Sequence, residues 1–200
     1  MPELSIENLP MPLVLFCGLL FLVSLQRLWE LRKSARNEAA LLEQGGRVLS
    51  DGHYVWMKLL HGSWLVACLV EAVWRADPPS LWLTVPMIVI LCVGQILRLL
   101  AIQTLGGRWT TRIVVLPGHP PVQRGIYTKI KHPNYLGVIL EIASLPLVYG
   151  CFYTALFYTV ANLVLLKVRI AAEEEALSEF CQYQDQFKDL NKFIPQSASN

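Results

Sequence analysis

The chain has 200 residues, of which 54% are hydrophobic and 16% are charged, and its formal net charge is +2. Soluble domains usually contain about a quarter charged residues, so this composition indicates an integral membrane protein of one domain. The small net charge and the lack of a recognition motif argue against a nucleic-acid partner. The five cysteines form no CxxC pair and the four histidines lack zinc-ligand spacing, so we expect no metal site.

Long apolar runs mark the candidate membrane spans, because about 20 apolar residues are needed to cross a bilayer. The last run is too long for one crossing, and it splits near Tyr149-Gly150 into two short or tilted helices. We therefore predict an all-α integral membrane helical bundle with about five transmembrane helices. The runs cover residues 11–29, 54–74, 81–102 and 135–167.

The basic residues predict how this bundle is oriented, since Lys and Arg are enriched on the cytoplasmic side of membranes. Five crossings with the N-terminus outside put all but one of the 17 Lys and Arg residues on the same side. The exception is Arg75, which follows the second span. We therefore predict an external N-terminus and a cytoplasmic C-terminus.

The segment from Pro78 to Leu140 contains no Asp or Glu, although it holds several basic residues and two histidines. One interpretation is that these charges set the topology and attract anionic lipid headgroups. A second interpretation is that they form a pocket for an anionic ligand. The pair Lys131-His132 is compatible with both.

A cluster of turn-forming and polar residues precedes the fourth span. Gly125 and Tyr127 lead into Lys131-His132-Pro133-Asn134-Tyr135-Leu136-Gly137. Pro133 favours the start of a helix, where unsatisfied backbone N–H groups can hold a carboxylate or a ring nitrogen of a ligand. Gly125 and Gly137 allow close backbone approach. Taken alone, the cluster is also explained as a helix start without a ligand.

A second polar cluster follows the fifth span. Asn162, Leu166, Arg169 and Glu173 share one helical face, and Arg169 and Glu173 form an i,i+4 pair at the membrane edge. That pair has a simpler explanation as an interfacial salt bridge of little energetic value. Two more acids lie inside apolar runs, where they must face protein or water, or be protonated. A simpler explanation for either acid is that it joins helices and has no part in a site. These acids are Glu71 and Glu141.

Together the two clusters resemble the isoprenylcysteine carboxyl methyltransferase family and its phospholipid-methyltransferase relatives. The first part reads Gly-x-Tyr-x-x-x-Lys-His-Pro-x-Tyr-x-Gly from Gly125, and the second reads Arg-x-x-x-Glu-Glu-Glu-x-Leu from Arg169. The resemblance extends from Gln103 to Pro195, because the tail is similar to the family's closing segment. That tail contains Phe180, Tyr183, Phe187 and Ile194-Pro195.

The resemblance implies a multi-span enzyme that uses S-adenosyl-L-methionine. Within one domain over residues 1–200, residues 1–102 would supply three spans and 103–200 the cofactor-binding core. Arg169 and Glu173 would face the acceptor and the transferring methyl, as catalytic residues. The implied cofactor-binding residues are Gly125, Tyr127, His132, Pro133, Tyr135, Gly137 and Glu174.

The resemblance also bears on the acceptor. Phe180-Cys181 replaces the family's usual Phe-Gly, and Leu105–Ile113 is more similar to a bacterial subgroup with relatives that O-methylate long-chain alkylpyrones. We therefore expect O-methylation of a lipophilic acceptor, either a prenylcysteine-like carboxylate or a polyketide hydroxyl. The expected location is a bacterial cytoplasmic membrane with the site facing the cytosol. The alternatives are N-methylation of a lipid amine and, outside enzymes, a small transporter or membrane scaffold.

Overall fold

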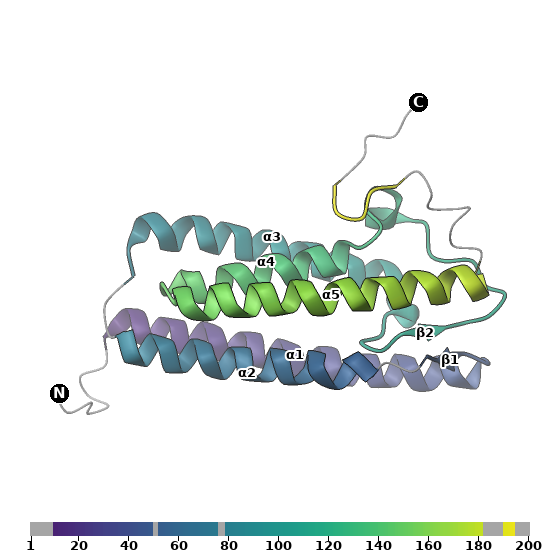
Figure 1. Cartoon of the computed structure of the whole chain (residues 1–200), viewed down its shortest axis with the longest axis horizontal. Helices are drawn as coiled ribbons and strands as arrows, with labels where there is room; N and C mark the ends of the chain where they lie inside the picture. The colour runs from purple at the N-terminus through teal and green to yellow at the C-terminus, as the bar shows by residue number, and fades with distance from the viewer. Residues whose placement is uncertain (1–9, 50–51, 76–78, 182–189, 195–200) are drawn as a thin grey trace.

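The computed structural model describes residues 10–49, 52–75, 79–181 and 190–194. Five helices lie side by side and alternate in direction, so that the start of the first and the end of the last lie at opposite ends of the bundle (Figure 1). The predicted all-α membrane bundle is confirmed. The helices are α1 (Met11–Glu43), α2 (Gly52–Arg75), α3 (Leu81–Leu105), α4 (Pro133–Val148) and α5 (Phe152–Cys181).

Four of the described helices, α1, α2, α3 and α5, are long and apolar enough to cross a membrane. The fourth in chain order, α4, has 16 residues, fewer than the roughly 20 of a full crossing. Much of α4 is buried between its neighbours, and it packs most extensively against α3. A helix enclosed by protein does not have to match the thickness of the bilayer.

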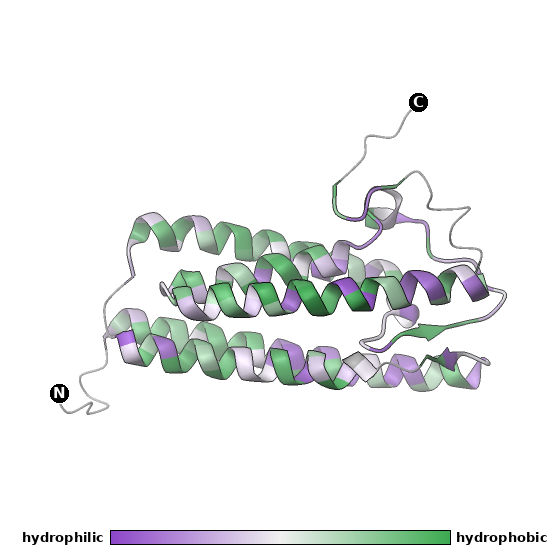
Figure 2. Ribbon diagram, in the orientation of Figure 1, coloured by the Kyte–Doolittle hydropathy of each residue, from purple (hydrophilic) through white to green (hydrophobic). Residues whose placement is uncertain are grey.

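Helices α1 and α5 continue well beyond the spans that their apolar runs predict. The predicted spans end near Trp29 and Lys167, whereas the helices end at Glu43 and Cys181. The added residues are mostly good helix formers without Gly or Pro, so nothing stops either helix where the apolar run ends. Figure 2 shows these polar extensions at the same end of the bundle.

Two glycines let α3 and α4 approach closely. A Cβ atom built at Gly137 would lie 2.6 Å from Arg98 Cγ and 2.7 Å from the Gly94 carbonyl oxygen. A Cβ at Gly94 would in turn lie 3.0 Å from the Gly137 carbonyl oxygen. Small residues at such crossings are how membrane helices gain packing contacts when the surrounding lipid is as apolar as they are.

Four charged side chains meet inside the bundle and are called here the buried quartet. Arg27 and Glu30 come from α1, Arg98 from α3 and Glu141 from α4. Arg27 pairs with Glu30 at 2.7 Å and also with Glu141, while Arg98 pairs with Glu30 and lies 3.5 Å from Glu141. Each charge therefore has partners of opposite sign, which an apolar surrounding requires.

Glu71, the other intramembrane acid, holds α2 against the start of α5. Its carboxylate accepts hydrogen bonds from the backbone N–H groups of Tyr153 at 3.2 Å and Thr154 at 2.7 Å. These are among the first N–H groups of α5, which have no partner within the helix. Glu71 and Glu141 thus both join helices.

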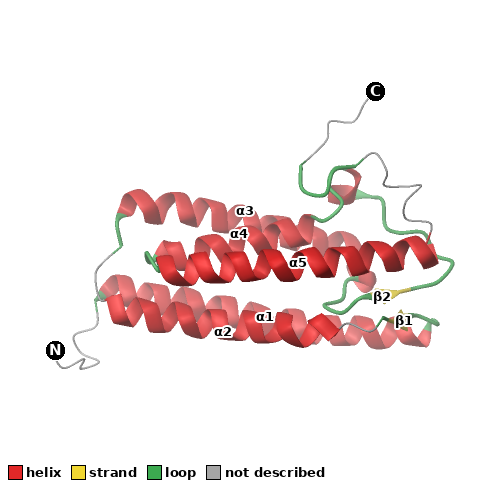
Figure 3. Cartoon of the chain, in the orientation of Figure 1, coloured by secondary structure: helices red, strands yellow, loops and turns green. Residues whose placement is uncertain are grey.

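The polar end of the bundle also contains short elements that the helical prediction missed (Figure 3). Strand β1 (Arg47–Val48) follows α1 and pairs antiparallel with β2 (Val114–Val115), with Arg47 opposite Val115. Two 3-10 turns, η2 (Gly106–Arg108) and η3 (Gly125–Thr128), lie on either side of β2 in the chain. The strand pair fastens the α3–α4 connection to the end of α1.

We expect Gly137→Leu to destabilise the protein by about 1–3 kcal/mol, the usual range for overpacking, because its side chain would meet the α3 backbone. Thermal unfolding in detergent checks this, with Gly18→Ala on α1 as the control because a Cβ there meets nothing within 4 Å. Equal stability of the two variants would contradict the close approach of α3 and α4.

The alternating helix directions, combined with the sorting of basic residues, predict opposite sides for two connections. A reporter fused at Ser80, before α3, should be active outside the cell, and one fused at Gly118, between β2 and α4, should be active in the cytoplasm. The Asp77 and Pro78 positions of the same external segment lie outside the described residues. External activity at Gly118 would reverse the predicted orientation.

Candidate active site

A pocket of about 420 Å³ opens within the polar half of the bundle. Its walls come from α1, α2, α3 and α5, from the connection that includes β2, and from the start of α4. Most of the exposed lining surface is apolar, although many lining residues carry charged or polar groups, and the volume lies in the range of small-molecule sites. The five predicted site residues on its walls are Tyr127, His132, Tyr135, Arg169 and Glu173.

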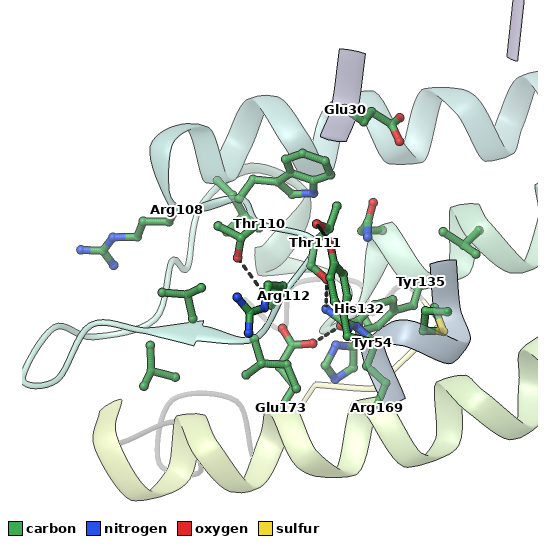
Figure 4. Close-up of a pocket in the computed structure, with 18 of the residues that line it drawn as sticks. Glu30, Tyr54, Arg108, Thr110, Thr111, Arg112, His132, Tyr135, Arg169 and Glu173 are labelled. Carbon is green, nitrogen blue, oxygen red and sulfur yellow. Dashed lines mark hydrogen bonds between the residues drawn. The ribbon is translucent and has the colours of Figure 1, made fainter. Parts of the chain in front are cut away.

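Tyr135 links the two residues predicted to be catalytic. Arg169 Nε donates to the Tyr135 hydroxyl oxygen at 2.9 Å, and the same hydroxyl donates to Glu173 Oε2. Figure 4 shows Arg169 and Glu173 projecting from α5 towards Tyr135 at the start of α4. Arg169 is 4% exposed and Glu173 is half-buried, so this network is not the solvated surface pair that the sequence left open.

The guanidinium group of Arg169 is held from a second direction. Its Nη2 donates to the backbone carbonyl of Thr111 at 2.6 Å. The Thr111 hydroxyl lies 2.8 Å from the Ser34 hydroxyl on α1 and 3.2 Å from the Tyr54 hydroxyl on α2. The orientation of Arg169 therefore depends on three other segments of the chain.

His132 occupies the position just before α4 and faces α5. Its Nε2 lies 2.9 Å from Glu174 Oε1, and the other carboxylate oxygen of Glu174 accepts from Lys192 Nζ at 2.7 Å. Because a carboxylate only accepts, Nε2 is the donor. The imidazole ring stacks on Tyr135 with 5.4 Å between ring centroids. Glu174 thus holds the His132 ring in place from outside the pocket and does not itself line it.

The start of α4 offers groups for a ligand. Asn134 lines the pocket, and its buried Oδ1 atom has no hydrogen-bond partner among the residues that the structure describes. Pro133 is the first residue of α4, so the early backbone N–H groups are unsatisfied within the helix. A buried acceptor beside helix N-terminal donors suits a ligand with both amino and carboxylate groups.

The remaining predicted residues support the site from outside the pocket. Gly125 has a φ of +55° and lies against Thr104, whose Oγ1 would be 3.0 Å from an added Cβ. Pro133 begins α4 and is buried. Gly137 faces α3 rather than the pocket, and Asn162 is fully buried on α5 outside the lining.

A short tail segment closes over the start of α4. The backbone N–H groups of Lys131 and His132 donate to the carbonyls of Asn191 and Lys192, each at 3.1 Å. Phe193 packs against the apolar cluster that contains Tyr135. The expected tail residues Tyr183, Phe187 and Pro195 lie outside the described residues.

Sequence reasoning missed Ser34, Tyr54 and Thr111, which orient Arg169 through the network above. All three lie in segments that were interpreted as loops or as helix ends. The only available signal was the Thr110-Thr111-Arg112 run within the acid-free connection. Nothing in that run reveals that a backbone carbonyl is the interacting atom.

Comparisons with known proteins agree with this fold. A sequence model of the isoprenylcysteine carboxyl methyltransferase family matches residues 87–179. The chain is 37% identical to the uncharacterized protein YpbQ of Bacillus subtilis over 166 residues, which is 83% of this chain and 98% of that protein. It is 25% identical to the protein-S-isoprenylcysteine O-methyltransferase of Schizosaccharomyces pombe, over 89% of this chain and 80% of that protein.

Among solved structures, the chain resembles the eukaryotic intramembrane Ras methyltransferase, isoprenylcysteine carboxyl methyltransferase. The TM-score is 0.64 at 21% identity, over 95% of this chain and 70% of that chain, which is evidence for the fold alone. The two-part motif, the helical arrangement and the relatives agree: the chain belongs to the isoprenylcysteine carboxyl methyltransferase family of membrane methyltransferases.

Proposed function

We propose that the protein uses S-adenosyl-L-methionine to O-methylate a lipophilic acceptor at the cytoplasmic face of the membrane. The observation that carries this proposal is the partly buried chain Arg169–Tyr135–Glu173 in the wall of a pocket between polar and apolar parts of the bundle. A polar cofactor from the cytosol and an amphiphile from the bilayer can both reach such a position. In bacteria the corresponding membrane is the cytoplasmic one.

The residues at the start of α4 fit the cofactor. The orphaned Asn134 Oδ1 can accept from its amino group, and the first N–H groups of α4 can bind its carboxylate. His132 and Tyr135 present stacked rings to the same region, and Tyr127 lines it as well. When bound, the cofactor supplies a methyl group on a positively charged sulfur.

Arg169 is suited to orienting the acceptor. Its Nε and one terminal nitrogen are hydrogen-bonded to Tyr135 and Thr111, which fixes the plane of the guanidinium group. A guanidinium fixed in this way can align an acceptor carboxylate or enolate by charge and hydrogen bonding. Alignment in a site that excludes water is the main contribution that a protein can make to an in-line displacement.

Glu173 has a role that depends on the acceptor. An ionised carboxylate needs no base, and Glu173 then serves to hold Tyr135 and, through it, Arg169. A hydroxyl acceptor must lose a proton, and Glu173 is the nearest carboxylate on the pocket wall to take it. The Tyr135 hydroxyl bonds to both Arg169 and Glu173, so a change in the position of one of these side chains alters the position of the other.

The charge of the surroundings favours an oxygen nucleophile over an amine. The connection between α3 and α4 has no acid and several bases, and a lipid amine would keep or gain positive charge beside them. The Schizosaccharomyces pombe relative is named for an isoprenylcysteine carboxyl acceptor. For this chain we propose a prenylcysteine-like carboxylate or a long-chain polyketide hydroxyl, entering from the membrane between helices.

Arg169→Ala and Glu173→Ala should each lower single-turnover methylation at saturating cofactor by at least ~10-fold, which corresponds to about 1.4 kcal/mol of transition-state stabilisation. Tyr135→Phe should also lower it, because the link between the two is cut while the ring remains. Glu175→Ala is the matched control, since Glu175 is an exposed acid on the same helix. Normal turnover in all three site variants, with folding checked by thermal unfolding, would refute this role.

Competition among three acceptors tests the proposed reaction. Purified protein is incubated with labelled cofactor and a prenylcysteine, a long-chain alkylpyrone and phosphatidylethanolamine. We expect label on one of the first two. Turnover nearly flat above pH ~5 indicates a carboxylate acceptor, since a model carboxyl group ionises near 4, whereas turnover that rises with pH indicates a hydroxyl. Methylation of phosphatidylethanolamine alone would replace O-methylation with lipid-amine N-methylation.

A further inference from the structure

His61 lies on the pocket wall, deeper in the bundle than the proposed reaction centre. It is on α2, one turn beyond Met57, which packs against the apolar cluster of Tyr135, Leu166 and Ile170. One turn of four residues advances about 6 Å along a helix. The direction is away from the polar end, because α2 begins at that end and runs towards Arg75.

The proton on the His61 ring has a fixed place. Nδ1 lies 2.7 Å from the backbone carbonyl oxygen of Met57. Since a carbonyl only accepts, Nδ1 carries the hydrogen and Nε2 of the neutral ring holds a lone pair. Nε2 has no hydrogen-bond partner among the described residues, and it lies on the ring edge farther from the helix backbone.

The charged groups beside His61 are already paired. Arg27, Glu30 and Arg98 of the buried quartet line the same inner part of the pocket. Each of them bonds to another member of the quartet, whose two positive and two negative charges balance. The quartet therefore adds no net charge to the inner wall, and His61 adds a neutral hydrogen-bond acceptor to it.

We propose that His61 Nε2 accepts a hydrogen bond from a neutral donor on the acceptor molecule, an amide N–H or a hydroxyl that lies deeper than the methylated oxygen. The proposal rests on the proposed function for the position of the reacting oxygen. It makes His61 a specificity-determining residue for amphiphiles that carry a second polar group. A plain hydrocarbon chain at this depth would leave the lone pair without a donor, which is unfavourable away from water.

Two matched ligand pairs test the proposal and separate the two sources of the donor. One pair is N-acetyl-S-farnesylcysteine and its N-methylated amide, and the other is an alkylpyrone with an additional chain hydroxyl and the corresponding methyl ether. Their dissociation constants are measured by calorimetry in detergent micelles, so that no turnover is needed. KM and kcat are measured separately for whichever pair is methylated.

In the wild type, the donor-bearing member of one pair should bind about fivefold more tightly than its capped partner, the value expected for one hydrogen bond. His61→Phe should abolish this difference by raising the dissociation constant and KM of the donor-bearing member, with little change in kcat. His61→Gln, whose amide oxygen can accept, should restore part of it. His119→Phe, on the exposed rim of the same pocket, is the control and should keep it.

Two outcomes would overturn the proposal: no discrimination by the wild type within either pair, or equal weakening of both members by His61→Phe. Cofactor binding by the His61 variants, measured in parallel, shows whether they are folded. The proposed function is judged separately. A pair difference that His61→Phe removes, in a protein that methylates neither ligand, supports the contact and refutes the O-methylation of these acceptors.

Discussion

The buried quartet of Arg27, Glu30, Arg98 and Glu141 is the interaction on which the rest of the bundle depends. Apolar faces alone do not hold helices together in a bilayer, because lipid tails satisfy them equally well. Charges in that setting must find each other, since an isolated one is costly. The quartet joins α1, α3 and α4, and three of its members also form the inner wall of the pocket.

The pocket therefore has two polar ends with different chemistry. At the inner end, the four charges of the quartet are paired with one another. At the outer end, Arg169 donates to the Tyr135 hydroxyl and to the Thr111 carbonyl. We place the reacting oxygen beside Arg169 because this side chain and Glu173 both bond to Tyr135 in the pocket wall.

The sequence predicted the helical bundle and both halves of the site, because apolar length and the two-part motif are local features. It also required Glu141 to face protein, but it did not identify Arg27 and Arg98 as the partners, since they are distant in the chain. Arg27 was instead counted with the cytoplasmic charges that set the topology. Helices α1 and α5 extend beyond the predicted spans because apolar length indicates the thickness of the bilayer and not the length of the helix. The β1–β2 pair has only two residues on each side, too few for any alternation to be visible.

The backbone carbonyls of Asn191 and Lys192 accept hydrogen bonds from the N–H groups just before α4, so the site is assembled in a fixed order. During synthesis, α4 and α5 leave the ribosome before this segment does. A nascent chain that has reached only Cys181 contains all of the described side chains that line the pocket, but it lacks the two carbonyls and Lys192, the partner of Glu174. Completion of the site is thus coupled to completion of the tail, and a prematurely ended chain would insert into the membrane without a finished pocket.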